Sequence, residues 1–199
     1  GDKATKNAEQ CTTLNKVQVN LKRVGGEKLV EAAGQQQGAQ ALESYEKAGT
    51  LYYDMFKKYC QEPVAANQQP QADRCDEIAY NSAKAFQAAR LIAKAIAVRK
   101  TLLDPRLKMD QSPLAKKALY EIGGNYQAIA VYDVAAKWFE DYAKADPGAD
   151  KADVALSDAV ILRLGLGQEN EAIADAQNFT KSYGAKKPAQ TASIQFAIG

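Results

Sequence analysis

The chain has 199 residues, of which 46% are apolar and 25% are charged, and its formal net charge is +2. This composition is typical of a globular chain, whereas the small net charge excludes the broad basic surface of a nucleic-acid-binding protein. No run of 18 apolar residues is free of charges, so no helix is predicted to span a membrane.

The sequence has no histidine and three cysteines, Cys11, Cys60 and Cys75. The missing histidine excludes Ser–His–Asp and Cys–His nucleophile systems and His-ligated zinc in this chain. The cysteines lack the close-paired spacing of a zinc ribbon. We therefore predict no metal site and no cofactor.

The predicted elements begin with a polar segment, residues 1–38, which contains the cluster "GQQQG". We expect a loosely packed helix there, interrupted at the glycine pair Gly25-Gly26. The two ends, "GDKATKN" and "SIQFAIG", look like cut points of an expressed fragment or a mature form, so we expect the chain to be part of a larger protein.

Residues 41–60 follow and are predicted to form a weakly marked helical hairpin, and residues 76–105 a second one. Between them, "EPVAANQQPQADR" (62–74) is predicted to be a loop. Cys60 and Cys75 flank this loop, and antiparallel helices would bring the two thiols together. We predict a Cys60–Cys75 disulfide with Cys11 unpaired; reduced thiols are the alternative.

The clearest hairpin lies between Lys116 and Pro147. Its apolar residues follow a 3-4-3 spacing on both sides of a short turn, as expected for two amphipathic helices. Residues 153–184 repeat the pattern 37 residues later, with a turn at "GLGQEN" (165–170), and residues 195–199 begin a further unit. The pair Gly123-Gly124 is expected to act as a breaker in this pattern, and Gly123 is also expected to let the two helices approach closely because it is small.

Counted from Lys116, marker residues stand at offsets 4, 7, 8, 11, 20, 24 and 32: Leu119, Ile122, Gly123, Tyr126, Ala135, Phe139 and Pro147. These offsets resemble the tetratricopeptide repeat, and in detail the repeat proteins of bacterial cell envelopes. The resemblance implies an all-α, right-handed α-solenoid of antiparallel hairpins over 39–199, truncated within its last repeat. It also implies a periplasmic or envelope location, which the expected disulfide favours.

Acidic residues occur in close pairs, Glu140 with Asp141, Asp146 with Asp150, and Asp153 with Asp158. Paired acids could cleave a glycan or hold a hard cation, but the predicted helices place most of them on solvated faces. We therefore predict no catalytic residue and no enzymatic activity. A glycan-cleaving helical domain is the weaker alternative.

The predicted function is a non-catalytic protein–protein interaction scaffold that binds a partner peptide or helix on the concave face of the array. The first helices of two units would supply the contact residues: Tyr80, Asn81, Lys84 and Gln87 from one, and Lys117, Tyr120, Glu121 and Gln127 from the other. A structural spacer within a larger envelope complex is the alternative.

Overall fold

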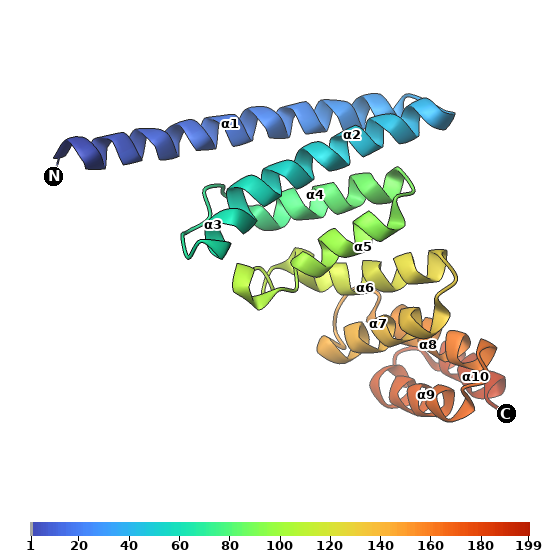
Figure 1. The fold of residues 1–199 in the computed structure, drawn as a ribbon. Coiled ribbons are helices and arrows are strands. Elements are labelled where there is room, and N and C mark those ends of the chain that lie inside the picture. Colours follow the sequence, from blue (N-terminus) through green and yellow to red (C-terminus); the bar gives the residue numbers. More distant parts are fainter. Residues whose placement is uncertain (1) are drawn as a thin grey trace. The chain divides into compact units, whose positions relative to one another are not determined.

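The computed structural model describes the backbone of residues 2–199, and the side chains from Gln10 onward except that of Thr12. Within this range the chain forms helices and short turns, and no strand (Figure 1). The helices are α1 (Asp2–Gly34), α2 (Gly38–Phe56), α3 (Glu62–Ala65), α4 (Cys75–Ala88), α5 (Ile92–Thr101), α6 (Pro113–Ala128), α7 (Tyr132–Ala145), α8 (Ala152–Gly165), α9 (Glu169–Tyr183) and α10 (Pro188–Ala197). A π-helical turn (Lys57–Gln61) and a 3₁₀ turn (Pro105–Leu107) complete them. The predicted all-α class is confirmed.

The chain divides into two compact units, Gly1–Ala115 and Lys116–Gly199. In unit 1, α1 packs on α2, α2 on α4, and α4 on α5. In unit 2, α7 packs on α8, α8 on α9, and α9 on α10. Within each unit these helices therefore pack on helices that are close to them in the sequence, which is the packing of a helical-repeat protein. The separation of 1–38 from 39–199 stays a prediction.

The turns inside three hairpins share one backbone conformation. Each contains a residue with positive φ just before the second helix: Arg90 at 62°, Ala130 at 60° and Gly167 at 70°. In each turn the next N–H donates a hydrogen bond to the carbonyl five residues earlier, at 2.8 to 3.0 Å. This is the Schellman arrangement that ends many helices. The repeat is thus visible in the backbone.

The two glycine pairs do not interrupt helices, contrary to the sequence-based expectation. Gly25-Gly26 lies inside α1 and Gly123-Gly124 inside α6. A Cβ on Gly26 would come within 2.5 Å of the Tyr52 ring, and a Cβ on Gly123 within 2.6 Å of the Phe139 ring. These glycines are therefore contact sites where an aromatic side chain of the next helix lies against the backbone.

The predicted hairpin over 41–60 is also wrong. Residues Gly38–Phe56 form one continuous helix, α2, which a π-helical turn extends to Gln61. This helix is the second arm of a hairpin with α1, and it also packs against α4. The predicted loop 62–74 begins with the short helix α3, in which Pro63 occupies the first turn, where its missing N–H costs nothing.

The core of unit 2 is built largely from alanines and aromatic rings. Ala135 and Ala172 are fully buried, and Phe139 and Phe179 are at most 1% exposed. Small residues on one helix leave room for rings from the next, so the hairpins approach closely. Pro147 follows the end of α7 at Ala145, as predicted for a residue that cannot continue a helix.

Candidate partner-binding groove

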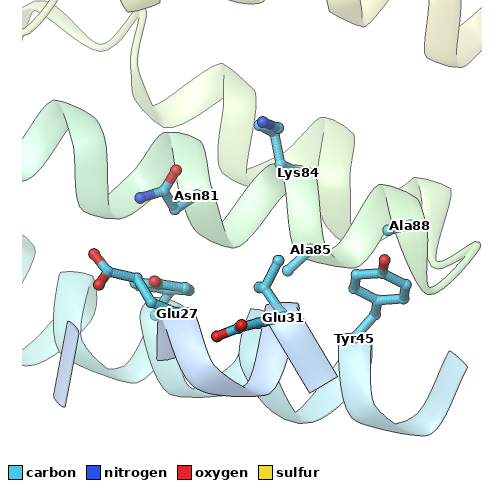
Figure 2. Close-up of a pocket in the computed structure, with 9 residues that line it drawn as sticks. Glu27, Glu31, Tyr45, Asn81, Lys84, Ala85 and Ala88 are labelled. Carbon is cyan, nitrogen blue, oxygen red and sulfur yellow. The ribbon is translucent and has the colours of Figure 1, made fainter. Parts of the chain in front are cut away.

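A groove of about 500 Å³ lies in unit 1 between α1, α2 and α4 (Figure 2). Its apolar part comes from all three helices, and its charged and amide groups come from α1 and α4. The lining residues are Glu27, Val30, Glu31, Tyr45, Tyr52, Asn81, Lys84, Ala85 and Ala88. A surface of this kind fits a segment that has one apolar face and one polar face.

Tyr52 fixes the floor of the groove. Its ring is 2% exposed and occupies the space that a Cβ on Gly26 would need. Its hydroxyl donates to the carbonyl oxygen of Arg23 at 3.4 Å. Burial raises the pKa of Tyr52, with the nearby Glu27 carboxylate acting in the same direction. The floor is therefore an uncharged aromatic surface at neutral pH.

Acidic groups line the α1 side of the groove. Glu27 and Glu31 are exposed and one helical turn apart, and no ion pair within the described residues engages either carboxylate. Across the groove, Asn81 and Lys84 project from α4 (Figure 2). The Lys84 ammonium lies 5.9 Å from the centre of the Tyr80 ring. The α1 side thus has two carboxylates available to a cationic ligand group.

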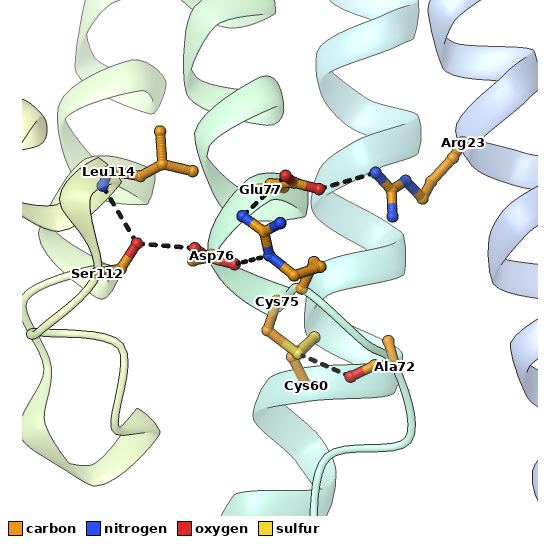
Figure 3. A network of polar contacts seen from close by, with 9 residues as sticks. Arg23, Cys60, Ala72, Cys75, Asp76, Glu77, Ser112 and Leu114 are labelled. Atoms are coloured by element: carbon orange, nitrogen blue, oxygen red, sulfur yellow. Dashed lines mark hydrogen bonds and ion pairs between the residues drawn. A yellow bond between two sulfur atoms is a disulfide. The ribbon is translucent and has the colours of Figure 1, made fainter.

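A polar network holds α4 against α1 next to the groove (Figure 3). Arg23 of α1 pairs with Glu77 of α4 at 2.9 Å, and Arg74 pairs with Glu77 at 2.8 Å. The Ser112 hydroxyl donates to Asp76 at 2.7 Å. Burial works to raise the pKa of Asp76, but the hydrogen bonds from Ser112 and Arg74 outweigh it and hold the pKa below its usual value.

The predicted disulfide is present and joins Cys60 to Cys75 (Figure 3). Cys60 lies in the π-helical turn after α2, and Cys75 is the first residue of α4. The bond therefore anchors the N-terminus of α4, the helix that carries Asn81 and Lys84. Cys11 is free and exposed on α1.

The four predicted contact residues of α4 have different environments. Asn81 and Lys84 line the groove. Tyr80 is only 7% exposed, so most of its surface is already covered within the chain. Gln87 is exposed, and its side-chain oxygen accepts a hydrogen bond at 2.6 Å from Arg99, which is 1% exposed. Gln87 thus satisfies a buried guanidinium.

The other four predicted contact residues lie on α6 in unit 2. Lys117 and Gln127 are exposed, and Glu121 is half-buried. Tyr120 has a packing role, because its ring centre lies 5.5 Å from those of both Phe139 and Tyr142. Burial raises the pKa of Tyr120. Whether these α6 residues bind a partner stays a prediction.

Sequence reasoning missed an acid pair between α7 and α9 of unit 2. Asp175 is 8% exposed and lines a cavity of about 550 Å³ together with Glu140. Burial raises the pKa of Asp175, with the Glu140 carboxylate acting in the same direction, and together they bring the pKa to about 7. Arg163 pairs with Oε1 of Glu140 at 2.7 Å. The sequence feature that could have revealed this pair is an aspartate in the apolar stripe of α9, which also contains Ala172, Ala176 and Phe179.

This pair does not have the geometry of a glycan-cleaving site. Such enzymes hold two carboxyl groups roughly 5 to 9.5 Å apart, with the sugar or a water between them. The Glu140 carboxylate lies close enough to Asp175 to raise its pKa, and Arg163 already pairs with Glu140, so the two carboxyl groups do not face each other across a space for a sugar.

None of the helices in the described part of the chain combines the length and the apolarity that a bilayer crossing requires. In the same part of the chain, no three His, Cys, Asp or Glu side chains are grouped so that they could hold a metal ion.

A comparison with solved structures finds the same fold elsewhere. The nearly identical TPR-like repeats of a kinesin light chain from Podosopora anserina superpose with a TM-score of 0.56, over 88% of this chain and 82% of that chain, at 14% sequence identity. No protein-family model and no curated protein sequence matches the chain. The chain therefore has a TPR-like fold.

Proposed function

We propose that the chain is a protein-binding scaffold, and that the groove between α1, α2 and α4 holds a helical or extended segment of its partner. The observation that carries this proposal is the composition of the groove. Val30 and Tyr45 offer accessible apolar surface beside the buried Tyr52, and Glu27 and Glu31 offer two carboxylates without an ion-pair partner in the described residues. The partner segment therefore has apolar residues on one face and a lysine or arginine beside them.

The groove is held in shape before a partner arrives. The disulfide, the Arg23–Glu77 ion pair and the contact of Tyr52 with Gly26 connect the three helices that line it. A surface that is already ordered loses little conformational entropy on binding. This rigidity favours a binding role over a role as a simple spacer, which would need no shaped groove.

The test is selection of a displayed library of 15-residue peptides on the intact chain. Enriched peptides are expected to carry apolar residues at helical or alternating spacing and at least one basic residue. Their affinity should fall at least tenfold in a Glu27→Lys/Glu31→Lys variant. The matched control is Glu169→Lys/Glu171→Lys, which changes two exposed carboxylates in unit 2. No enrichment, or equal losses in both variants, would overturn the proposal.

We also propose an oxidising compartment, of which the periplasm or cell envelope is one. The structural match is to a kinesin light chain, so it supports the repeat fold and not an envelope origin. The support is the Cys60–Cys75 bond, because reducing compartments rarely keep disulfides. Peptide mapping of chain purified without reductant tests the bond, and free thiols at both positions would contradict it.

A further inference from the structure

Helix α1 carries a row of exposed apolar side chains on the face that points away from α2. Leu14, Val17, Leu21 and Val24 are 60%, 50%, 68% and 48% exposed. Their 3-4-3 spacing places them on one stripe of the helix. Val19, on the opposite face, is 2% exposed and belongs to the core of unit 1. Helix α1 therefore has two opposed apolar faces, and the described part of the chain covers only one of them.

The length of α1 leaves further surface of this helix uncovered by α2. Helix α1 has 33 residues and α2 has 19, so the N-terminal part of α1 extends beyond α2 (Figure 1). Apolar side chains arranged in a stripe on an exposed helix are typical of a surface that another helix covers. The four residues of the outer stripe are hereafter called the α1 stripe.

We propose that the α1 stripe is a dimer interface, in which α1 packs antiparallel against α1 of a second copy of this chain. A two-fold interface must be complementary to itself. The α1 stripe has this property, because positions 14, 17, 21 and 24 are arranged symmetrically about position 19. Reversal places Leu14 opposite Val24 of the partner copy and Val17 opposite Leu21. Every layer then combines one leucine with one valine.

The same residues disfavour a parallel pair. In heptad terms, Leu14 and Leu21 occupy a positions and Val17 and Val24 occupy d positions, the reverse of the arrangement that favours parallel two-stranded coils. Lys28 continues the a row, so a parallel pair would place two lysines together. In the antiparallel pair Lys28 lies opposite Gln10, a neutral residue that can accept a hydrogen bond.

The interface is small, with four apolar layers between the two copies. Stable interfaces generally bury more surface than four such layers provide. The expected dimer is therefore weak and depends on concentration, with a dissociation constant on the order of micromolar.

Sedimentation equilibrium of the intact chain, with its disulfide, tests the association. The expected result is reversible dimerisation, weakened at least tenfold by Leu21→Glu. Helix content by circular dichroism should stay unchanged, because Leu21 is exposed. Ile161→Glu is the matched control, since Ile161 is 60% exposed in unit 2. A chain that stays monomeric up to millimolar concentration, or a dimer that Leu21→Glu leaves intact, would overturn the proposal.

The native free thiol tests the orientation. In the antiparallel pair Cys11 lies level with residue 27 of the other copy, 16 residues from the second Cys11. At 1.5 Å per residue this is about 24 Å along the axis. Spin labels on Cys11 should therefore give a distance of about 25 to 35 Å by pulsed electron paramagnetic resonance. A distance below about 15 Å would show a parallel pair and contradict the proposed arrangement.

Discussion

Glycine residues in this chain set helix–helix distances. In three places an aromatic ring of one helix lies where the Cβ of a glycine on another would be: Tyr52 on Gly26, Phe86 on Gly49 and Phe139 on Gly123. Each ring fills the gap between two neighbouring helices. This close approach requires glycine, because a Cβ at these positions would overlap with the ring in an interior that has no spare room.

Substitution at the Gly123-Gly124 pair should therefore have opposite effects at its two positions. Gly123→Ala places a methyl group 2.6 Å from the Phe139 ring and should destabilise the chain by about 1 to 3 kcal/mol. Gly124→Ala meets no atom within 4 Å and should stabilise α6 by about 0.5 to 1 kcal/mol. Thermal unfolding of both variants measures the difference, and equal shifts would contradict the packing role of Gly123.

Asp175 makes the stability of unit 2 depend on pH. Its pKa is about 7 in the folded chain, because of burial and of Glu140, against roughly 3.9 in an unfolded chain. Between these values the folded state holds a proton that the unfolded state has lost. The free energy of unfolding therefore falls as pH rises from about 4 to 7, and the loss is complete above pH 7.

An amide at this position removes the titration and can still donate a hydrogen bond to Glu140. Asp175→Asn should stabilise the chain by roughly 1 to 2 kcal/mol at pH 8 and leave it nearly unchanged at about pH 4. Chemical denaturation at both pH values measures the effect. Asp141→Asn, an exposed acid on the rim of the same cavity, is the control. A variant that is destabilised at pH 8 would show that the charged carboxylate is needed.

At the scale of single elements, the hairpins of the second half were predictable because α7 to α9 have regular apolar spacing and Gly167 marks a turn. The positive φ values in the turns at Arg90 and Ala130 were not predictable, since neither residue type indicates a positive φ. The continuous helix α2 was mistaken for a hairpin of its own, whereas its packing partners are α1 and α4. The Phe86 ring that lies against Gly49 of α2 comes from a position 37 residues further along the chain.

The residues of the candidate groove were likewise only partly predictable from the sequence. Asn81 and Lys84 were predicted from their position on a first helix, and both line the groove. Glu27 and Glu31 were missed, because the N-terminal segment was expected to be loosely packed. Only the packing of α1 on α2 and the Arg23–Glu77 ion pair between α1 and α4 bring these carboxylates to the groove. Tyr80 has the same helical register as its predicted neighbours but faces inward.

At the scale of the whole molecule, the two compact units provide the last prediction. Repeat proteins are stabilised by contacts within each repeat and between neighbouring repeats. Parts of an array that are weakly coupled to each other can therefore unfold separately. The Cys60–Cys75 bond closes a loop of 15 residues in unit 1 and, in the chain-entropy model, contributes about 3 kcal/mol there. Its effect should be confined to that unit.

Calorimetry of the oxidised chain should therefore show two transitions. Cys60→Ser/Cys75→Ser, or a reducing agent, should lower one of them by roughly 10 °C or more and leave the other in place. Gly123→Ala should move the other transition, because Gly123 and Phe139 both lie in unit 2. Cys11→Ser is the control for loss of a thiol alone, since Cys11 forms no disulfide. A single transition that shifts as a whole in every variant would mean that the units unfold as one cooperative array.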